Sequence, residues 1–205
     1  MNGTQHHVLS GKSEALRRLF RTAACVVGLI GTAGIASYPN HSYGNEFVSN
    51  IKLLNYTDNY GNISLRGAGR ISLPDPLIVK GNLNLEMSRL TALPNKLTVK
   101  GNLDLAYSHI TQLPSQLAVG GYINLAHSAI TYLNNGLHVK GDLSLMGTKI
   151  KNLPPYLYVG GNLYLANTAI TELPNYLVVG GNIYLGGAKV SSIPETAQIS
   201  GYVYQ

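Results

Sequence analysis

A Leu-Pro dipeptide recurs along this 205-residue chain at separations that are always multiples of 20. The copies begin at Leu73, Leu93, Leu113, Leu153 and Leu173, and the remaining positions hold Leu133-Asn134 and Ile193-Pro194. A fixed period of 20 predicts a solenoid in which every unit forms one coil. Six full units cover residues 73–192, and a seventh follows. The phase extends back to Gly61, so the solenoid is predicted to span residues 61–205.

Each unit follows the pattern LPxxLxVxGxLxLxx(S/T)xIxx. Two stretches in it alternate between apolar and other residues, as in Leu117 with Val119 and then Ile123 with Leu125. This alternation predicts two short strands per unit with their apolar side chains inward. The Gly between the stretches, such as Gly121, predicts a tight corner. Because one unit buries too little apolar surface to offset its conformational entropy, the coils have to stack on one another.

A hydroxyl residue follows the second stretch in five units, at Ser88, Ser108, Ser128, Thr148 and Thr168. We interpret this column as a hydrogen-bonding ladder that satisfies buried backbone groups at the turn. A catalytic serine is the competing interpretation, and five equivalent copies argue against it. The single cysteine, Cys25, excludes an intrachain disulfide and a zinc site built from several cysteines. The sequence therefore predicts a non-enzymatic protein without cofactor or metal.

The Leu-Pro opening, the LxL stretch (Leu83/Leu85 through Ile183/Leu185) and the following Ser-x-Ile (Ser108-His109-Ile110) resemble the bacterial LPX class of leucine-rich repeats. That class occurs in type III secreted effectors of the YopM and IpaH kind and in related phage-borne proteins. The resemblance implies a solenoid of parallel coils that binds a partner on its concave face. Two features depart from the class: Ser or Thr replaces the usual Asn after the strand, and the LxV stretch predicts a flatter solenoid.

The N-terminal segment, residues 1–37, is basic and then apolar. Arg17, Arg18 and Arg21 precede an uncharged run at residues 22–36, which predicts one apolar helix. The segment fits a secretory signal cleaved after Ala36, a membrane anchor formed by residues 15–37, or a helix that packs on the first coil. The first interpretation predicts a secreted or envelope protein of a bacterium, and the second a membrane-anchored one. Residues 38–60 are predicted to be a polar linker and N-terminal cap.

Side chains next to the LxL stretch are predicted to point outward on the concave sheet and to bind the partner. These candidate site residues are Asn82, Asn84, Asn102, Asp104, Tyr122, Asn124, Asp142, Asn162, Tyr164, Asn182, Tyr184, Tyr202 and Tyr204. Amides and carboxylates dominate the N-terminal half, and tyrosines the C-terminal half. Exposed tyrosines are typical of recognition surfaces. Ladders of Asn and Tyr also stabilise solenoids without any partner, so both interpretations stay open.

Other surfaces give weaker signals. Lys80, Lys100 and Lys140 form a column on the opposite side, where Tyr156, Tyr158 and Tyr176 also lie. Stacked lysines fit solvated edge protection better than an anionic partner. No nucleic-acid-binding module is present, so nucleic acid is not expected as a partner. The potential metal or acid–base residues, Glu86, Asp104, His109 and His127, occupy different phases of the repeat, which argues against a shared site.

These observations predict a protein–protein interaction scaffold, secreted or surface-displayed and effector-like, that binds a host or envelope protein. A glycan is a further potential ligand of the same face. The alternatives are a structural or adhesive repeat element, which would pair with another chain through the open strand at residues 202–205, and a fragment of a longer repeat protein.

Overall fold

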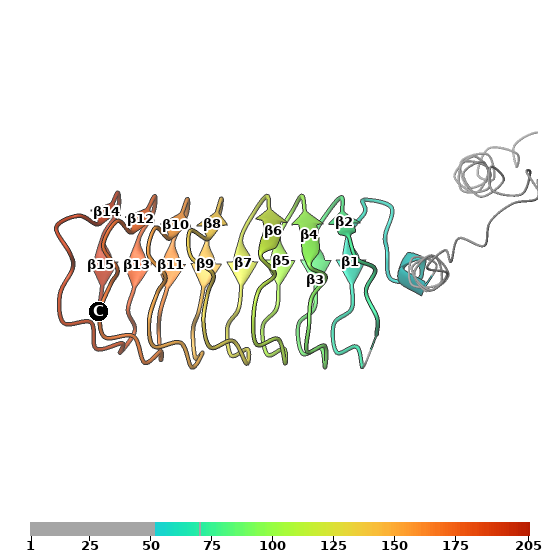
Figure 1. The fold of residues 1–205 in the computed structure, drawn as a ribbon, viewed down its shortest axis with the longest axis horizontal. Coiled ribbons are helices and arrows are strands. Elements are labelled where there is room, and N and C mark those ends of the chain that lie inside the picture. Colours follow the sequence, from blue (N-terminus) through green and yellow to red (C-terminus); the bar gives the residue numbers. More distant parts are fainter. Residues whose placement is uncertain (1–51, 70) are drawn as a thin grey trace, which may run out of the picture. The chain divides into compact units, whose positions relative to one another are not determined.

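The computed structural model describes residues 52–69 and 71–205. This part of the chain is a parallel β-solenoid, in which strands 20 residues apart pair side by side (Figure 1). The predicted β-rich solenoid with a 20-residue repeat is thus confirmed. The predicted N-terminal helix, and all of residues 1–51, lie outside the described residues. Within the described residues, no helix has the length and apolarity needed to cross a membrane.

The coils are numbered here by repeat unit. Coil 1 is residues 73–92, each later coil begins 20 residues further on, and coil 7 begins at Ile193. Every coil gives one strand to a front sheet, from the LxL stretch, and one to a back side, from the LxV stretch. Both strands predicted for each unit are therefore present.

The front sheet is continuous and has eight strands. In spatial order they are β1 (Ile63–Ser64), β3 (Leu83–Asn84), β5 (Leu103–Asp104), β7 (Ile123–Asn124), β9 (Leu143–Ser144), β11 (Leu163–Tyr164), β13 (Ile183–Tyr184) and β15 (Val203–Tyr204). Register is kept throughout, so that Leu83 pairs with Leu103 and Asn84 with Asp104. In the six strands from β3 to β13 the first residue is buried and the second partly exposed, because neighbouring side chains of a strand point to opposite faces.

The back strands form two separate sheets. The first holds β2 (Leu77–Val79), β4 (Lys96–Val99) and β6 (Gln116–Val119), and the second holds β8 (His138–Val139), β10 (Tyr158–Val159), β12 (Val178–Val179) and β14 (Gln198–Ile199). The division falls between coil 3 and coil 4 and was not predicted. It makes the back side different in the two parts of the solenoid.

The turn before the back strand explains the division. In coils 4–6, the residue two positions before the back strand adopts the left-handed region. These residues are Gly136, Tyr156 and Tyr176, with φ of 67°, 56° and 60°. The equivalent residues of coils 2 and 3, Lys96 and Gln116, already belong to extended strands. Glycine adopts the left-handed region at no steric cost, which makes Gly136 the natural point for the change. The back strands of coils 4–6 consequently shorten to two residues, and the back strand of coil 7 has the same length.

The predicted corner between the two strands of a coil has no room for a side chain. A Cβ added at Gly141 would lie 2.9 Å from the carbonyl carbon of Gly121, so the stacked corners need glycine.

The hydroxyl column bonds to the backbone. The hydroxyls of Ser128, Thr148 and Thr168 each donate to the carbonyl three residues earlier at 2.7 Å. The prediction that the hydroxyl column satisfies buried backbone groups at the turn is therefore confirmed for these three residues, and each bond stays within its own coil. The remaining two hydroxyls, of Ser88 and Ser108, have no hydrogen-bond partner within the described residues.

The described part of the predicted linker and cap covers the unit before coil 1, which contains β1. A helical turn at residues 52–54 buries Leu53, which is 5% exposed and belongs to the core. Thr57 then forms an antiparallel bridge with Ile63. Ser64 N donates to the carbonyl oxygen of Tyr56 at 3.0 Å. Residues 52–58 thus protect the edge strand β1 of the front sheet.

Candidate binding face

The candidate residues lie on the outward side of the front sheet, here called the front face. Three columns of side chains make it up. The lead column, just before each strand, holds Asn62, Asn82, Asn102, Tyr122, Asp142, Asn162, Asn182 and Tyr202. The strand column holds Ser64, Asn84, Asp104, Asn124, Ser144, Tyr164, Tyr184 and Tyr204. The trailing column consists of the residue that directly follows each LxL stretch, and it holds Arg66, Glu86, Ala106, Ala126, Met146, Ala166 and Gly186. The 13 candidate residues all fall in the first two columns.

The lead column is the true ladder between coils. Each Asn or Asp side chain accepts a hydrogen bond from the backbone N–H of the next coil, at 2.7–3.0 Å. Asn102 Oδ1, for example, accepts from Tyr122 N. The ladder breaks once, because the phenol of Tyr122 offers no equivalent acceptor to coil 4. These side chains therefore hold the solenoid together, and the recurrence of Asn directly after Gly was the sequence signal for it.

The strand column changes its chemistry along the solenoid. In coils 1–3, Asn84, Asp104 and Asn124 each accept from the backbone N–H two residues later, at 2.9–3.1 Å. These bonds close the turn after the strand. One side-chain oxygen of each of these residues therefore already accepts a hydrogen bond from the backbone of its own coil.

Three tyrosines replace these turn-closing residues in coils 5–7. Tyr164 and Tyr184 stack with ring centroids 4.9 Å apart at 6°, and Tyr184 and Tyr204 stack at 5.0 Å and 9°. Both faces of the Tyr184 ring are covered by its neighbours. A partner would meet ring edges and hydroxyls along the stack, together with the uncovered faces of Tyr164 and Tyr204.

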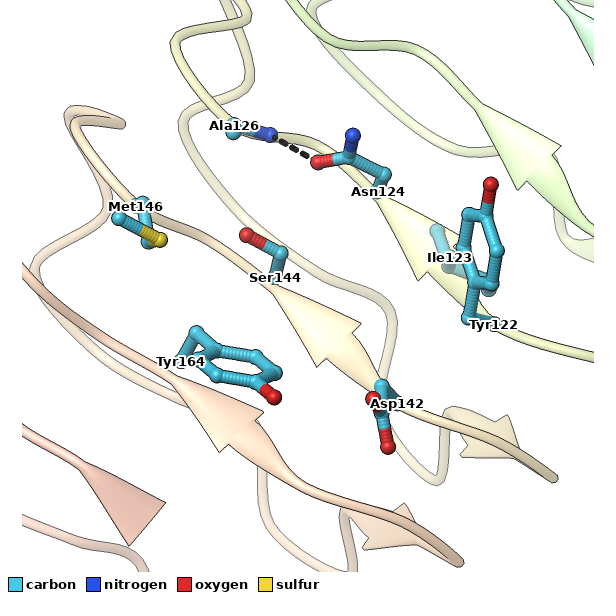
Figure 2. A pocket seen from close by; sticks show the side chains of 8 residues that line it. All are labelled: Tyr122, Ile123, Asn124, Ala126, Asp142, Ser144, Met146 and Tyr164. Atoms are coloured by element: carbon cyan, nitrogen blue, oxygen red, sulfur yellow. Dashed lines mark hydrogen bonds between the residues drawn. The ribbon is translucent and has the colours of Figure 1, made fainter.

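Coil 4 forms a hollow in the front face (Figure 2). Ser144 pairs in register with Tyr164, and its short side chain leaves the adjacent ring face uncovered. The hollow has a volume of about 340 Å³, and among its lining residues are Tyr122, Asn124, Asp142, Ser144, Met146 and Tyr164. Tyr122 from coil 3 and Tyr164 from coil 5 stand on its two sides. The hollow is thus bounded by aromatic rings, with a carboxylate between them.

The front face is acidic although the chain is basic overall. The chain has a formal net charge of +6. The three columns contain Glu86, Asp104 and Asp142, and Arg66 is their only Lys or Arg within the described residues. Arg66 Nε pairs with Glu86 Oε2 at 2.9 Å, which leaves the two aspartates without a cationic partner in that part of the chain.

The two tyrosines beside the hollow have raised phenol pKa values, chiefly because of burial. Burial, followed by the negative charge of Asp104, raises the pKa of the Tyr122 phenol. Burial, followed by the charges of Asp142 and Tyr184, likewise raises the pKa of Tyr164. Both phenols therefore stay neutral at physiological pH and face a negative potential.

The residues considered for a metal or acid–base site are not brought together. Glu86 pairs with Arg66, the His127 ring stacks on Tyr107 at 4.8 Å, and His109 Nδ1 lies 3.2 Å from the carbonyl oxygen of Ser88. Across residues 52–69 and 71–205, no cluster of three or more His, Cys, Asp or Glu side chains could hold a metal ion.

The back side carries its own aromatic pairs. His138 stacks on Tyr158 with centroids 4.1 Å apart, and Tyr156 stacks on Tyr176 at 5.4 Å. The lysines of the predicted column, Lys80, Lys100 and Lys140, are exposed there. This side is divided between two sheets, whereas the front face lies on one continuous sheet.

Comparisons of the chain with protein-family models, with curated proteins and with solved structures found no match. The features of the described residues that bear on function are the tyrosine stack of the front face and the hollow beside it.

Proposed function

We propose that this chain is a non-enzymatic protein–protein interaction scaffold of the leucine-rich-repeat kind. In this proposal it is a secreted or surface-displayed bacterial protein, effector-like, which binds a host or envelope protein through its front face. The observation that carries the proposal is the stack of Tyr164, Tyr184 and Tyr204 on one continuous eight-stranded sheet.

The tyrosine stack has the physical properties of a recognition surface. Tyrosine combines a large apolar ring with a hydroxyl, so it contributes both contact area and hydrogen bonds. Stacking fixes the rings before a partner arrives, and a side chain that is already ordered loses little entropy on binding. Tyr204 remains 46% exposed despite its stacking on Tyr184.

The leucine-rich-repeat part of the proposal rests on the repeat itself. Support comes from the 20-residue spacing and from the LxL stretch, whose first residue is buried in coils 1–6. The extra back strand in every coil is the main departure from the pattern of the class. The secreted location rests only on the basic and apolar character of residues 1–37.

The test is partner capture by a front-face variant and a matched back-side variant. Tyr164, Tyr184 and Tyr204 are changed together to Ser, and the control changes Tyr156 and Tyr176 to Ser, which removes another stacked pair. We expect the front-face variant to lose at least about tenfold in retained host or envelope protein, and the control to bind as the parent does. Circular dichroism checks that both variants stay folded. Unchanged capture by the front-face variant would exclude the proposed face.

The second candidate function is a structural or adhesive element that assembles by edge pairing. β14 and β15 lie at the edges of their sheets, and Tyr202 beside them is 73% exposed. Such an edge can pair with a second chain. Sedimentation over a range of concentrations tests this, because a strict monomer at the highest concentration would count against assembly through this edge.

A further inference from the structure

The hollow on coil 4 differs from the rest of the front face, because it combines the free face of a tyrosine ring with a carboxylate that has no cationic partner among residues 52–69 and 71–205. We propose that it receives a cationic side chain, of the lysine or arginine kind, from a basic segment of the partner protein. The inference rests on the proposed function, since it names the chemistry that the front face recognises.

Tyr164 has one ring face that the tyrosine stack does not cover, and this residue lines the hollow. One face of this ring is covered by Tyr184, and the other looks over Ser144. A cation binds an aromatic ring most strongly over its face, within about 6 Å of the centroid. Neighbouring strands lie about 4.8 Å apart, so a group seated above Ser144 falls within that range. The change from Tyr164 in coil 5 to Ser144 in coil 4 therefore leaves space in which a cationic group can lie over the Tyr164 ring.

Asp142 supplies a carboxylate to the lining of the hollow. Its Oδ1 accepts from Asn162 N at 2.7 Å, which fixes the side chain at the edge of the hollow. In the described residues no Lys, Arg or His pairs with it. Asp142 is the single acid of the lead column, where every other member is Asn or Tyr. The ladder bond needs only a carbonyl-type oxygen, so it does not account for the charge.

Charge is unevenly distributed over the described surface of the solenoid. The front columns carry an excess of acidic residues, and the lysines lie elsewhere on the solenoid. A basic segment is consequently attracted to the front face and repelled by the other sides. The volume of about 340 Å³ is at the low end of ligand pockets, roughly 300–1,000 Å³, and suits one side chain better than a larger molecule.

The experiment titrates the full chain with two lysine probes, one with a charged and one with an acetylated, neutral side-chain nitrogen. Nα-acetyl-lysine amide carries the ammonium group, and Nα,Nε-diacetyl-lysine amide does not. NMR follows the ring signals of Tyr164 and Tyr122. We expect the charged probe to shift these signals and the neutral probe to bind at least about fivefold more weakly, in line with the strength of exposed cation–π and ion pairs.

The variants separate charge from shape. Asp142→Asn keeps the acceptor for Asn162 N, as Asn102 and Asn162 do in their own coils, and is expected to weaken the charged probe about fivefold. Glu172→Gln makes the same charge change at an exposed residue outside the front columns and is expected to have no effect. Ser144→Tyr extends the tyrosine stack into the hollow and is expected to abolish binding while the chain remains folded.

The outcomes distinguish this inference from the proposed function. Equal binding of the two probes, or an unchanged affinity in Asp142→Asn, overturns the cation site. A neutral chitin disaccharide that binds equally to the parent and to Asp142→Asn, and competes with the lysine probe, would identify a glycan subsite instead. If the cation site fails while the triple tyrosine variant still loses its partner, the proposed function stands. If that triple variant keeps its partner, the proposed function fails whatever the hollow binds.

Discussion

Coils 1–3 and coils 4–7 share one repeat pattern, yet they differ on both sides of the solenoid. On the back, the earlier coils have strands of up to four residues, and the later coils have a turn followed by a strand of two. On the front, the strand column holds turn-closing Asn and Asp in coils 1–3, Ser144 in coil 4 and stacked tyrosines in coils 5–7. The change in back strands and the break in the lead-column ladder both occur between coils 3 and 4. The hollow lies beside the same junction.

This comparison shows that one core pattern tolerates two local backbone solutions. The buried positions are aliphatic on both sides of the junction, so burial alone does not distinguish the two forms. At the junction itself, back pairing is absent and Leu117 is only partly buried. Cohesion there comes from the front sheet and from Asn134, whose amide donates to the carbonyls of Leu113 at 3.2 Å and Pro114 at 3.1 Å.

The largest effect is expected from core truncation on either side of the junction. Leu163→Ala in coil 5 and Leu103→Ala in coil 2 each remove a fully buried side chain from a front strand. Each should lower the free energy of unfolding by about 2–5 kcal/mol. Because coils contact only their neighbours, a weak junction confines the damage to its own side. Hydrogen exchange should therefore rise in coils 4–7 for Leu163→Ala and in coils 1–3 for Leu103→Ala. An even rise along the whole chain in both variants would show that the junction is as cohesive as any other interface.

A smaller effect is expected from restoring the Leu-Pro dipeptide at the junction. Asn134→Pro matches the repeat pattern, and pattern matching by itself predicts stabilisation. The structure predicts the opposite, because proline removes both amide bonds that bridge coils 3 and 4. We expect a loss of about 1–2 kcal/mol in urea unfolding. Asn152→Ala, an exposed residue at the end of coil 4, is the control and should change little. A more stable Asn134→Pro protein would contradict the bridging role.

The smallest effect on the stability of the fold is expected when the pH is raised into the alkaline range. The pKa values of Tyr122 and Tyr164 are raised above the ordinary value of 10.0 in the folded chain. The fold thus favours the neutral phenols, so their contribution to stability is complete below pH 10.0 and is lost as the pH rises through the raised pKa values. Thermal unfolding at increasing alkaline pH measures this loss. Tyr164→Phe should reduce it, and Tyr132→Phe, which lies outside the front columns, should not.

Much of the fold could be predicted from the spacing of a few residues. Leu83, Leu103 and Leu143 are buried as expected, because a 20-residue period repeats the same inward position in every coil. The candidate residues lie in the predicted columns for the same reason. The break on the back side could not be predicted, since it depends on whether the residue before the strand takes a left-handed or an extended backbone. Gly136 hinted at it, but Tyr156 and Tyr176 adopt the same conformation without being glycine.

The roles of the polar columns were also decided by contacts between coils. The hydroxyls of residues such as Ser128 bond to the backbone of their own coil, whereas the side-chain oxygens of residues such as Asn102 accept from the next coil. Both types recur with the same period, so spacing alone cannot tell which oxygen reaches the next coil.

The sequence by itself therefore determined the repeat, the buried aliphatic positions and the order of side chains along the front face. These follow from periodicity, which any regular stacking has to preserve. The tertiary structure alone decided which polar groups bond between coils, where the back sheet divides and where a ring face stays uncovered. These depend on distances of a few ångströms between units 20 residues apart, as between Ser144 and Tyr164, and on the backbone conformation of single residues.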